Sequence, residues 1–188
     1  MALPVAQRRF TWEEVLRMAQ AGILHEDDRL ELVRGHLVEM PPIGERHAHL
    51  VARIDHVLRR GLGDRAVFQV QNPLWLTRYT VVQPDIMVLR PRADLYPHYP
   101  RPADAFLVVE VADATLAYDR GLKARLYARH GVPELWVADV PGDRVEVHRA
   151  RGATRYRAVQ AFVRGQRVAP LAFPDTSFDV ADLLGEPS

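Results

Sequence analysis

Residues 81–127 read VVQPDIMVLRPRADLYPHYPRPADAFLVVEVADATLAYDRGLKARLY, and this stretch decides the fold. It contains a strand opened by a Pro-Asp pair, a second strand at 106–111 that carries one glutamate, and a helix that carries a lone lysine. A continuous apolar run like that at 106–111 is typical of strands buried on both faces. The stretch therefore predicts a sheet covered by helices, with ionisable groups placed inside it.

Glu110 is the ionisable group in the apolar run, between Val109 and Val111. A carboxylate is seldom fully buried without a partner. Desolvating it alone costs several kcal/mol, roughly, unless a cation or hydrogen bonds compensate. A metal ion, a buried ion pair, or water at the end of the strand would each supply that compensation, so Glu110 alone does not choose among them.

Asp85 supplies a second carboxylate at the start of the preceding strand. Pro84 suits the first residue of a strand because it lacks a backbone donor, although an Asp after Pro is also common in turns. Two carboxylates on neighbouring strands raise each other's pKa, whereas a divalent cation between them removes the conflict. The chain has no Cys and no paired-His motif, so oxygen ligands favour Mg²⁺ or Mn²⁺ over Zn²⁺.

Lys123 is the only Lys among the 25 Lys and Arg residues. The two cations are not interchangeable, since the Lys ammonium is a compact point charge. Lys123 lies within one helical stripe expected to face the sheet, where a charge near a metal could orient water or stabilise a phosphate transition state. The alternative is a lysine at the border of the stripe that reaches water by its stem. The stripe consists of Asp119, Leu122, Lys123, Leu126, Tyr127 and His130.

Pro84-Asp85 followed by Glu110 on the next strand resembles the PD-(D/E)XK nuclease superfamily. In that motif the lysine lies two residues after the second acid, where this chain has Ala112. Lys123 resembles the form of the motif in which the lysine has migrated to the following helix. More narrowly, the chain resembles a prokaryotic family described as putative restriction endonucleases. The matching segments are LELVRG at 30–35, VQPD at 82–85, VVEV at 108–111, the Asp-Lys-Tyr spacing at 119, 123 and 127, and GVPELW at 131–136.

The resemblance implies a metal-dependent phosphodiesterase core. It implies that Glu31 is a third carboxylate at the site, whereas strand alternation alone favours a solvated face for Glu31. It also implies that the carbonyl of Val111 joins Asp85, Glu110 and Glu31 around the metal. The candidate catalytic residues are therefore Asp85, Glu110, Lys123 and Glu31, and the candidate metal ligands are Asp85, Glu110, Glu31 and Val111.

Four further residues are candidates for supporting roles. By resemblance, His47 contacts phosphate or the Glu31 region, and a surface histidine is the other interpretation. Gln83 could fix a metal-bound water or phosphate, although a polar residue at a strand edge needs no such role. Asp119 and Tyr127 are expected to orient Lys123 rather than to react.

Composition and length predict one soluble domain over residues 1–188. Hydrophobic content of 48% and charged content of 26% are ordinary for a globular protein. The formal net charge of +1 is too small to indicate nucleic-acid binding by itself. No apolar stretch near the roughly 20 residues of a membrane span and no charged leader are present. With no Cys for disulfides, we expect a cytoplasmic protein.

The remaining elements predict an α/β fold of the restriction-endonuclease-like type, with a central mixed sheet flanked by helices. A capping box at Thr11 and Glu14 predicts a helix that ends at Gly22, and Asp179 is expected to cap a last helix through Leu184. Seven arginines between 144 and 167 could hold a phosphate backbone or protect edge strands from aggregation. Beyond residues 81–127, we expect a hairpin at 30–33 and 36–40, a helix at 47–62, and strands at 66–70, 74–77, 134–140, 144–149 and 155–163.

The leading functional hypothesis is a Mg²⁺-dependent or Mn²⁺-dependent endonuclease acting on nucleic acid, with DNA favoured over RNA. A homo-oligomer, dimer or higher, is expected by analogy with nucleases that cut both strands. Ala112 and the near-zero net charge support a different class, a non-catalytic nucleic-acid or partner-binding module on a nuclease scaffold. Hydrolysis of another phosphate ester is the third alternative.

Overall fold

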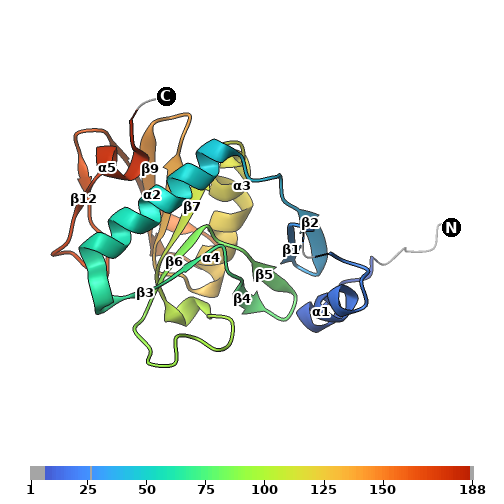
Figure 1. Ribbon diagram of the computed structural model, residues 1–188. Helices are drawn as coiled ribbons and strands as arrows, with labels where there is room; N and C mark the ends of the chain where they lie inside the picture. The colour runs from blue at the N-terminus through green and yellow to red at the C-terminus, as the bar shows by residue number, and fades with distance from the viewer. Residues whose placement is uncertain (1–6, 26, 187–188) are drawn as a thin grey trace.

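The computed structural model describes residues 7–25 and 27–186. Within these residues the strands form a six-stranded sheet in the order β10-β9-β8-β7-β6-β3, a four-stranded sheet in the order β2-β1-β5-β4, and the pair β11-β12. Helices pack around the larger sheet, and the smaller sheet lies beside it, next to the N-terminal helix α1 (Figure 1). The architecture is the mixed α/β arrangement that the sequence predicts.

The larger sheet is antiparallel except for one neighbouring pair, β7 and β8. A helical crossover joins this parallel pair and ends at Gly131. Gly131 has a φ of +107° and ends the crossover helix in the left-handed conformation that glycine adopts without strain. The strands are β3 (Val67–Val70), β6 (Ile86–Leu89), β7 (Ala105–Ala112), β8 (Leu135–Asp139), β9 (Arg144–Arg151) and β10 (Tyr156–Val163).

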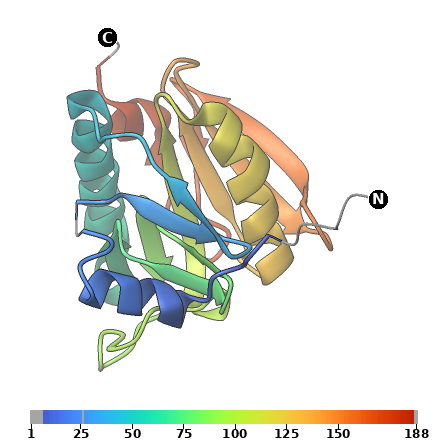
Figure 2. The same cartoon turned by 90° about the vertical axis from the view of Figure 1, so that its right-hand side faces the viewer.

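Both faces of β7 are buried, which explains its continuous apolar sequence. Leu107, Val109 and Val111 join the core beneath α2 (Glu45–Leu62). Val108 and Ala112 join the core beneath α4 (Ala124–His130) on the opposite face. Figure 2 shows α2 and α4 on either side of the sheet. Because strand residues alternate between faces, Glu110 points to the α4 side.

The crossover after β7 is not one regular helix. It consists of α3 (Leu116–Tyr118), a π-helical turn η3 (Asp119–Lys123), and α4. The expected stripe faces the sheet for most of its length, since Asp119, Lys123, Leu126 and Tyr127 are buried. Leu122 and His130 are half-buried at its border.

The smaller sheet contains the hairpin that the sequence predicts and one strand that it does not. The hairpin turns at Arg34 and Gly35, whose φ angles are +53° and +86°. The unpredicted strand is β5, which has three residues and leads directly into the link to β6. The strands are β1 (Leu30–Val33), β2 (His36–Glu39), β4 (Leu74–Thr77) and β5 (Thr80–Val82).

The chain therefore changes sheets at the Pro-Asp pair. β5 pairs with β1 and β4 in the smaller sheet, whereas β6 pairs with β3 and β7 in the larger one. The sequence predicts the strands at 66–70 and 74–77 but not this change of sheet before the Asp85 strand. Pro84 cannot donate a ladder hydrogen bond, so it suits a link between sheets.

The first and last helices begin where the sequence predicts, but one of the two predicted capping contacts is absent from the described residues. The capping box at Thr11 and Glu14 opens α1 (Trp12–Gln20) as predicted. Asp179 is the N-cap residue of α5 (Val180–Leu184), but its carboxylate makes no capping bond and accepts from Arg167 at 2.6 Å. The expected side-chain cap is therefore wrong, because a charged partner on β11 competes for the carboxylate. The remaining elements are η1 (Gly63–Arg65), η2 (Pro102–Asp104), β11 (Arg167–Val168) and β12 (Phe178–Asp179).

No helix within residues 7–25 and 27–186 has both the length and the apolar character needed to span a bilayer.

Candidate active site

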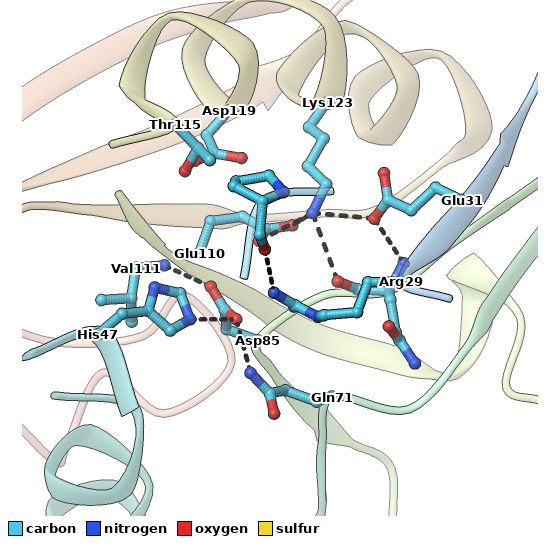
Figure 3. Close-up of polar contacts among 12 residues, drawn as sticks. Arg29, Glu31, His47, Gln71, Asp85, Glu110, Val111, Thr115, Asp119 and Lys123 are labelled. Atoms are coloured by element: carbon cyan, nitrogen blue, oxygen red, sulfur yellow. Dashed lines mark hydrogen bonds and ion pairs between the residues drawn. The ribbon is translucent and has the colours of Figure 1, made fainter. Parts of the chain in front are cut away.

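Elements from distant parts of the chain meet at a pocket of about 200 Å³. Figure 3 shows the side chains that converge there. The structure thus brings together the three carboxylates, the histidine and the lysine that the sequence singles out. They are Glu31 from β1, His47 from the first turn of α2, Asp85 from the link between the sheets, Glu110 from β7, and Lys123 from η3.

Lys123 is the centre of this arrangement. Its Nζ lies 3.1 Å from Oε1 of Glu31 and 3.1 Å from Oε1 of Glu110, and it also donates to the carbonyl of Gln83 at 3.3 Å. The lysine is only 3% exposed. Burial alone would lower the pKa of Lys123, but the charges of Glu110 and Glu31 outweigh it and raise that pKa well above its ordinary value. Lys123 is therefore a buried ammonium held by two carboxylates.

Glu110 is held from two sides. The hydroxyl of Tyr127 donates to its Oε1 at 2.5 Å, and Lys123 donates to its Oε2 at 3.1 Å. Burial raises the pKa of Glu110 well above its ordinary value against the opposing charge of Lys123, and Asp119 and Asp85 raise it further. Tyr127 thus contacts the Glu110 carboxylate, which in turn accepts from Lys123.

Glu31 accepts three hydrogen-bond or ionic contacts although it is 1% exposed. The backbone N–H of Gln83 donates to Oε1 at 2.8 Å, beside Lys123, and the hydroxyl of Tyr118 donates to Oε2 at 3.0 Å. Gln83 therefore serves the site through its main chain. The solvated face that strand alternation allows for Glu31 is not what the structure contains.

Tyr118 is a residue that sequence reasoning missed. It directly precedes η3, where the π-helical turn departs from the 3.6-residue period used to trace the stripe. Burial, and then the charge of Glu31, raise the pKa of Tyr118. The hydroxyl therefore stays protonated and available as a donor to Glu31.

Asp85 has its own set of partners on the α2 side of the pocket. Nε2 of His47 lies 3.0 Å from Oδ1, and the N–H of Val111 donates to Oδ2 at 2.8 Å. Gln71, also missed from the sequence, donates to Oδ1 at 3.4 Å. Burial alone would raise the pKa of Asp85, but His47 and Lys123 lower it overall. Val111 meets the site through its N–H, and a role for its carbonyl stays a prediction.

His47 and Arg29 add positive charge beside Asp85. The hydrogen bond to Asp85 raises the pKa of His47 despite partial burial. Arg29, which the sequence analysis did not single out, lines the pocket and donates to the carbonyl of Pro41. Only the folded arrangement places Arg29 here, since it precedes β1 in a segment without a recognisable motif.

Asp119 completes the acidic lining. It accepts a hydrogen bond from the hydroxyl of Thr115 at 2.5 Å, and burial raises its pKa against the charge of Lys123. Asp119 therefore affects Lys123 through its charge, while its hydrogen bond goes to Thr115.

The pocket's donor chemistry fits one hard divalent cation. In the described part of the chain, no three His, Asp or Glu side chains form a ready-made metal site. Glu31 and Glu110 each accept from Lys123 and from a tyrosine hydroxyl, so a bound cation would share these oxygens with the protein's own donors. Mg²⁺ is commonly bound by one or two carboxylates together with substrate phosphates. The acidic residues that line the pocket, Glu31, Asp85, Glu110, Asp113 and Asp119, would also make a cation favourable there.

The match to a protein family covers nearly all of this fold. The family Uma2, described as "putative restriction endonuclease", matches residues 12–181. The chain belongs to the Uma2 family. This Uma2 chain contains the whole pocket within the matched residues, so the family match includes every candidate site residue.

A solved structure shares the Uma2 fold. It is a putative nuclease belonging to DUF820 from Anabaena variabilis, with a TM-score of 0.70 and 17% sequence identity. The match covers 93% of this chain and 97% of that one. The likeness confirms the α/β fold with a central mixed sheet flanked by helices that the sequence predicts. No match was found among curated proteins.

Proposed function

We propose that this protein is a metal-dependent endonuclease that hydrolyses phosphodiester bonds of DNA. The observation that carries the proposal is the buried ammonium of Lys123, which lies 3.1 Å from Glu110 in an open pocket that Asp85 also lines. Burying two charges carries a large desolvation cost, so an ion pair like this one does little for the stability of the fold. Stability alone therefore does not explain why Lys123 is buried here. Membership of a family described as putative restriction endonucleases supports the same reaction.

Asp85 and Glu110 are the proposed ligands of one Mg²⁺ or Mn²⁺ ion. When bound, such an ion polarises the phosphate and lowers the pKa of a coordinated water. Glu31 and the Val111 carbonyl remain candidate ligands. Because Glu31 already accepts from Lys123, Tyr118 and Gln83, its proposed part is to hold Lys123 in place.

Lys123 is proposed to orient the attacking water and to stabilise charge on the phosphate. Its raised pKa keeps it protonated, so it acts as a donor and a point charge rather than as a base. Attack of the water on phosphorus would form the new P–O bond and break the bond to the 3′ oxygen, and the proton that the water loses would end on that oxygen or in solvent. Tyr127 positions Glu110, and His47 positions Asp85.

Arg29 and His47 are proposed to bind the substrate phosphate at the mouth of the pocket. Both line the pocket, and both carry positive charge when His47 is protonated. A cytoplasmic location and a homo-oligomer, dimer or higher, belong to the same proposal by analogy with nucleases that cut both strands.

The test incubates purified protein with plasmid and with linear DNA, in Mg²⁺, in Mn²⁺ and in chelator. We expect cutting that requires metal and that Asp85→Asn and Lys123→Ala abolish. Asp94→Asn is the matched control, since Asp94 is exposed and forms an ion pair with Arg92 on the surface. Cutting that survives both site substitutions would refute the assignment.

A non-catalytic binding module is the second candidate. Ala112, at the usual position of the motif's lysine, favours it, and so does the close pairing of Lys123 with Glu31 and Glu110. Calorimetric titration with Mn²⁺ separates the two. Saturable binding that Asp85→Asn removes supports the nuclease, whereas DNA binding without metal binding supports the module. A panel of other phosphate esters tests the third alternative.

A further inference from the structure

A second charged surface lies at the tips of the smaller sheet, outside the lining of the pocket. Its tips are the β1–β2 turn at Arg34-Gly35 and the β4–β5 turn at Arg78-Tyr79. The segment that leads into α1 crosses both tips. Phe10 N–H donates to the Gly35 carbonyl at 2.8 Å, and Gly35 N–H donates to the Tyr79 carbonyl at 2.7 Å. The tips and the N-terminal segment therefore form one continuous surface.

Two arginine guanidiniums lie over the ring of one tyrosine on this surface, and a third arginine joins them through its backbone carbonyl. We call these four residues the hairpin-tip patch. The guanidinium of Arg9 lies 4.8 Å from the ring centroid of Tyr79, and that of Arg78 lies 5.0 Å from it. Nε of Arg9 donates to the Arg34 carbonyl at 2.7 Å. The three arginine side chains are exposed, so the patch presents positive charge beside an aromatic ring. Its members are Arg9, Arg34, Arg78 and Tyr79.

The arginines of the hairpin-tip patch differ from those of the basic cluster at 144–167. In that cluster, Arg144, Arg149, Arg164 and Arg167 pair with acidic side chains. Among the residues that the structure describes, no acidic side chain forms an ion pair with Arg9, Arg34 or Arg78. The cluster that the sequence singles out thus largely serves the fold, whereas the patch holds cations together without counter-charge.

Arg34 also occupies an unfavourable backbone position. Its φ of +53° lies in the left-handed region, where hairpin turns favour Asn, Asp or Gly. A long side chain with positive φ is uncommon and costs conformational energy. Asn at this position would suit the turn better, so the turn geometry does not explain an arginine. A contact made by the guanidinium of Arg34 would explain it.

We propose that the hairpin-tip patch binds the phosphate backbone of duplex DNA that enters the pocket, which rests on the nuclease function proposed above. Paired arginines and an aromatic ring are the groups that hold nucleic-acid backbones without reading sequence. Arg34 is three residues from Glu31 along β1, or about 10 Å at the rise of a β-strand. That span corresponds to about three base-pair steps of 3.4 Å. The patch therefore contacts phosphates a few steps from the bond that is cut.

The experiment measures binding of a labelled duplex by fluorescence anisotropy in chelator, where no cutting occurs, across a series of salt concentrations. The test variant combines Arg9→Gln, Arg34→Asn and Arg78→Gln, which remove charge while suiting each backbone position. Because each lost phosphate contact reduces the salt slope by about 0.9, we expect the slope to fall by about 2 to 3. We also expect affinity to fall at least about tenfold at physiological salt.

The matched control removes the same charge outside both the patch and the 144–167 cluster, with Arg17→Gln, Arg60→Gln and Arg125→Gln, all exposed residues. Unfolding curves confirm that both triple variants fold, and Arg78→Glu alone repeats the test if the triple variant is unstable. If the patch variant binds DNA with the same affinity and the same salt slope as the control variant, the proposal is wrong. Wild-type protein that binds DNA through the patch but never cuts it overturns the nuclease and leaves the patch standing. Wild-type protein that cuts DNA, together with a patch variant whose DNA binding is unchanged, supports the nuclease and overturns the patch.

Discussion

Nζ of Lys123 lies 3.1 Å from Oε1 of Glu31, although one residue belongs to the crossover after β7 and the other to the smaller sheet. This ion pair is a buried connection between the two sheets. Both side chains are nearly inaccessible, at 3% and 1%, so each depends on the other for compensation of its charge. The site and the docking of the smaller sheet are therefore linked.

Replacing Lys123 with Met tests this dependence. The substitution leaves Glu31 and Glu110 buried without their cation, so we expect unfolding free energy to fall by about 3 to 5 kcal/mol in chelator. Denaturant unfolding measures the change. Adding Glu110→Gln to Lys123→Met removes one of the two stranded charges and should recover part of the loss. A double variant no more stable than the single one would contradict this account.

Arg29→Ala tests the mouth of the pocket. Because Arg29 lines the pocket without touching the buried ion pair, we expect a higher KM for DNA with a much smaller change in kcat. Arg29→Lys keeps the charge and should restore most of the affinity. Steady-state cleavage with a short duplex measures both constants. If Arg29→Ala lowered kcat and left KM unchanged, Arg29 would act in the chemical step rather than in substrate binding.

His148 predicts a pH dependence of stability. Burial lowers its pKa below the ordinary value of 6.5, against the opposing charge of Glu146. As pH falls through that value, the unfolded chain binds a proton before the folded chain does, so stability decreases. His148→Gln removes this contribution. We expect the urea midpoint to drop more in wild type than in the variant between about pH 8 and about pH 5.5. Equal drops would show that His148 does not contribute.

Gly61 and Gly121 make a matched pair of glycine substitutions. A Cβ on Gly61 would lie 2.4 Å from the ring of Phe178, so Gly61→Ala should destabilise the protein by about 1 to 3 kcal/mol despite the better helix propensity of Ala. A Cβ on Gly121 meets nothing within 4 Å, and Gly121→Ala should be neutral or stabilising by up to about 1 kcal/mol. Thermal unfolding ranks the two. The reverse order would mean that α2 and β12 can separate at little cost.

The sequence predicts the larger sheet well because its signals are local. The apolar run at 106–111 indicates burial on both faces, and Gly131 with Pro133 marks the end of the crossover. The lone Glu110 and Lys123 need partners once buried, so their meeting follows from the cost of desolvation. These inferences need no knowledge of how the rest of the chain packs.

What the sequence misses depends on longer-range geometry. β5 is only three residues long, too short for alternation to identify it. Tyr118 joins the site beside a π-helical turn, which a regular helical period cannot anticipate. Gln71 and Arg29 carry no motif, and only tertiary placement brings them to the pocket. Asp179 has the right position for a cap, but Arg167 takes its carboxylate.

The length of the link between β5 and β6 sets the distance between acidic groups that belong to different sheets. The N–H of Gln83 fixes Glu31, and two residues later Asp85 receives the N–H of Val111 from the other sheet. Inserting a single residue in this link would still let each sheet form, but Glu31 and Asp85 would no longer meet in the pocket. The tolerance of surface loops to changes in length thus does not extend to this connection, and its length is as much a part of the site as its side chains.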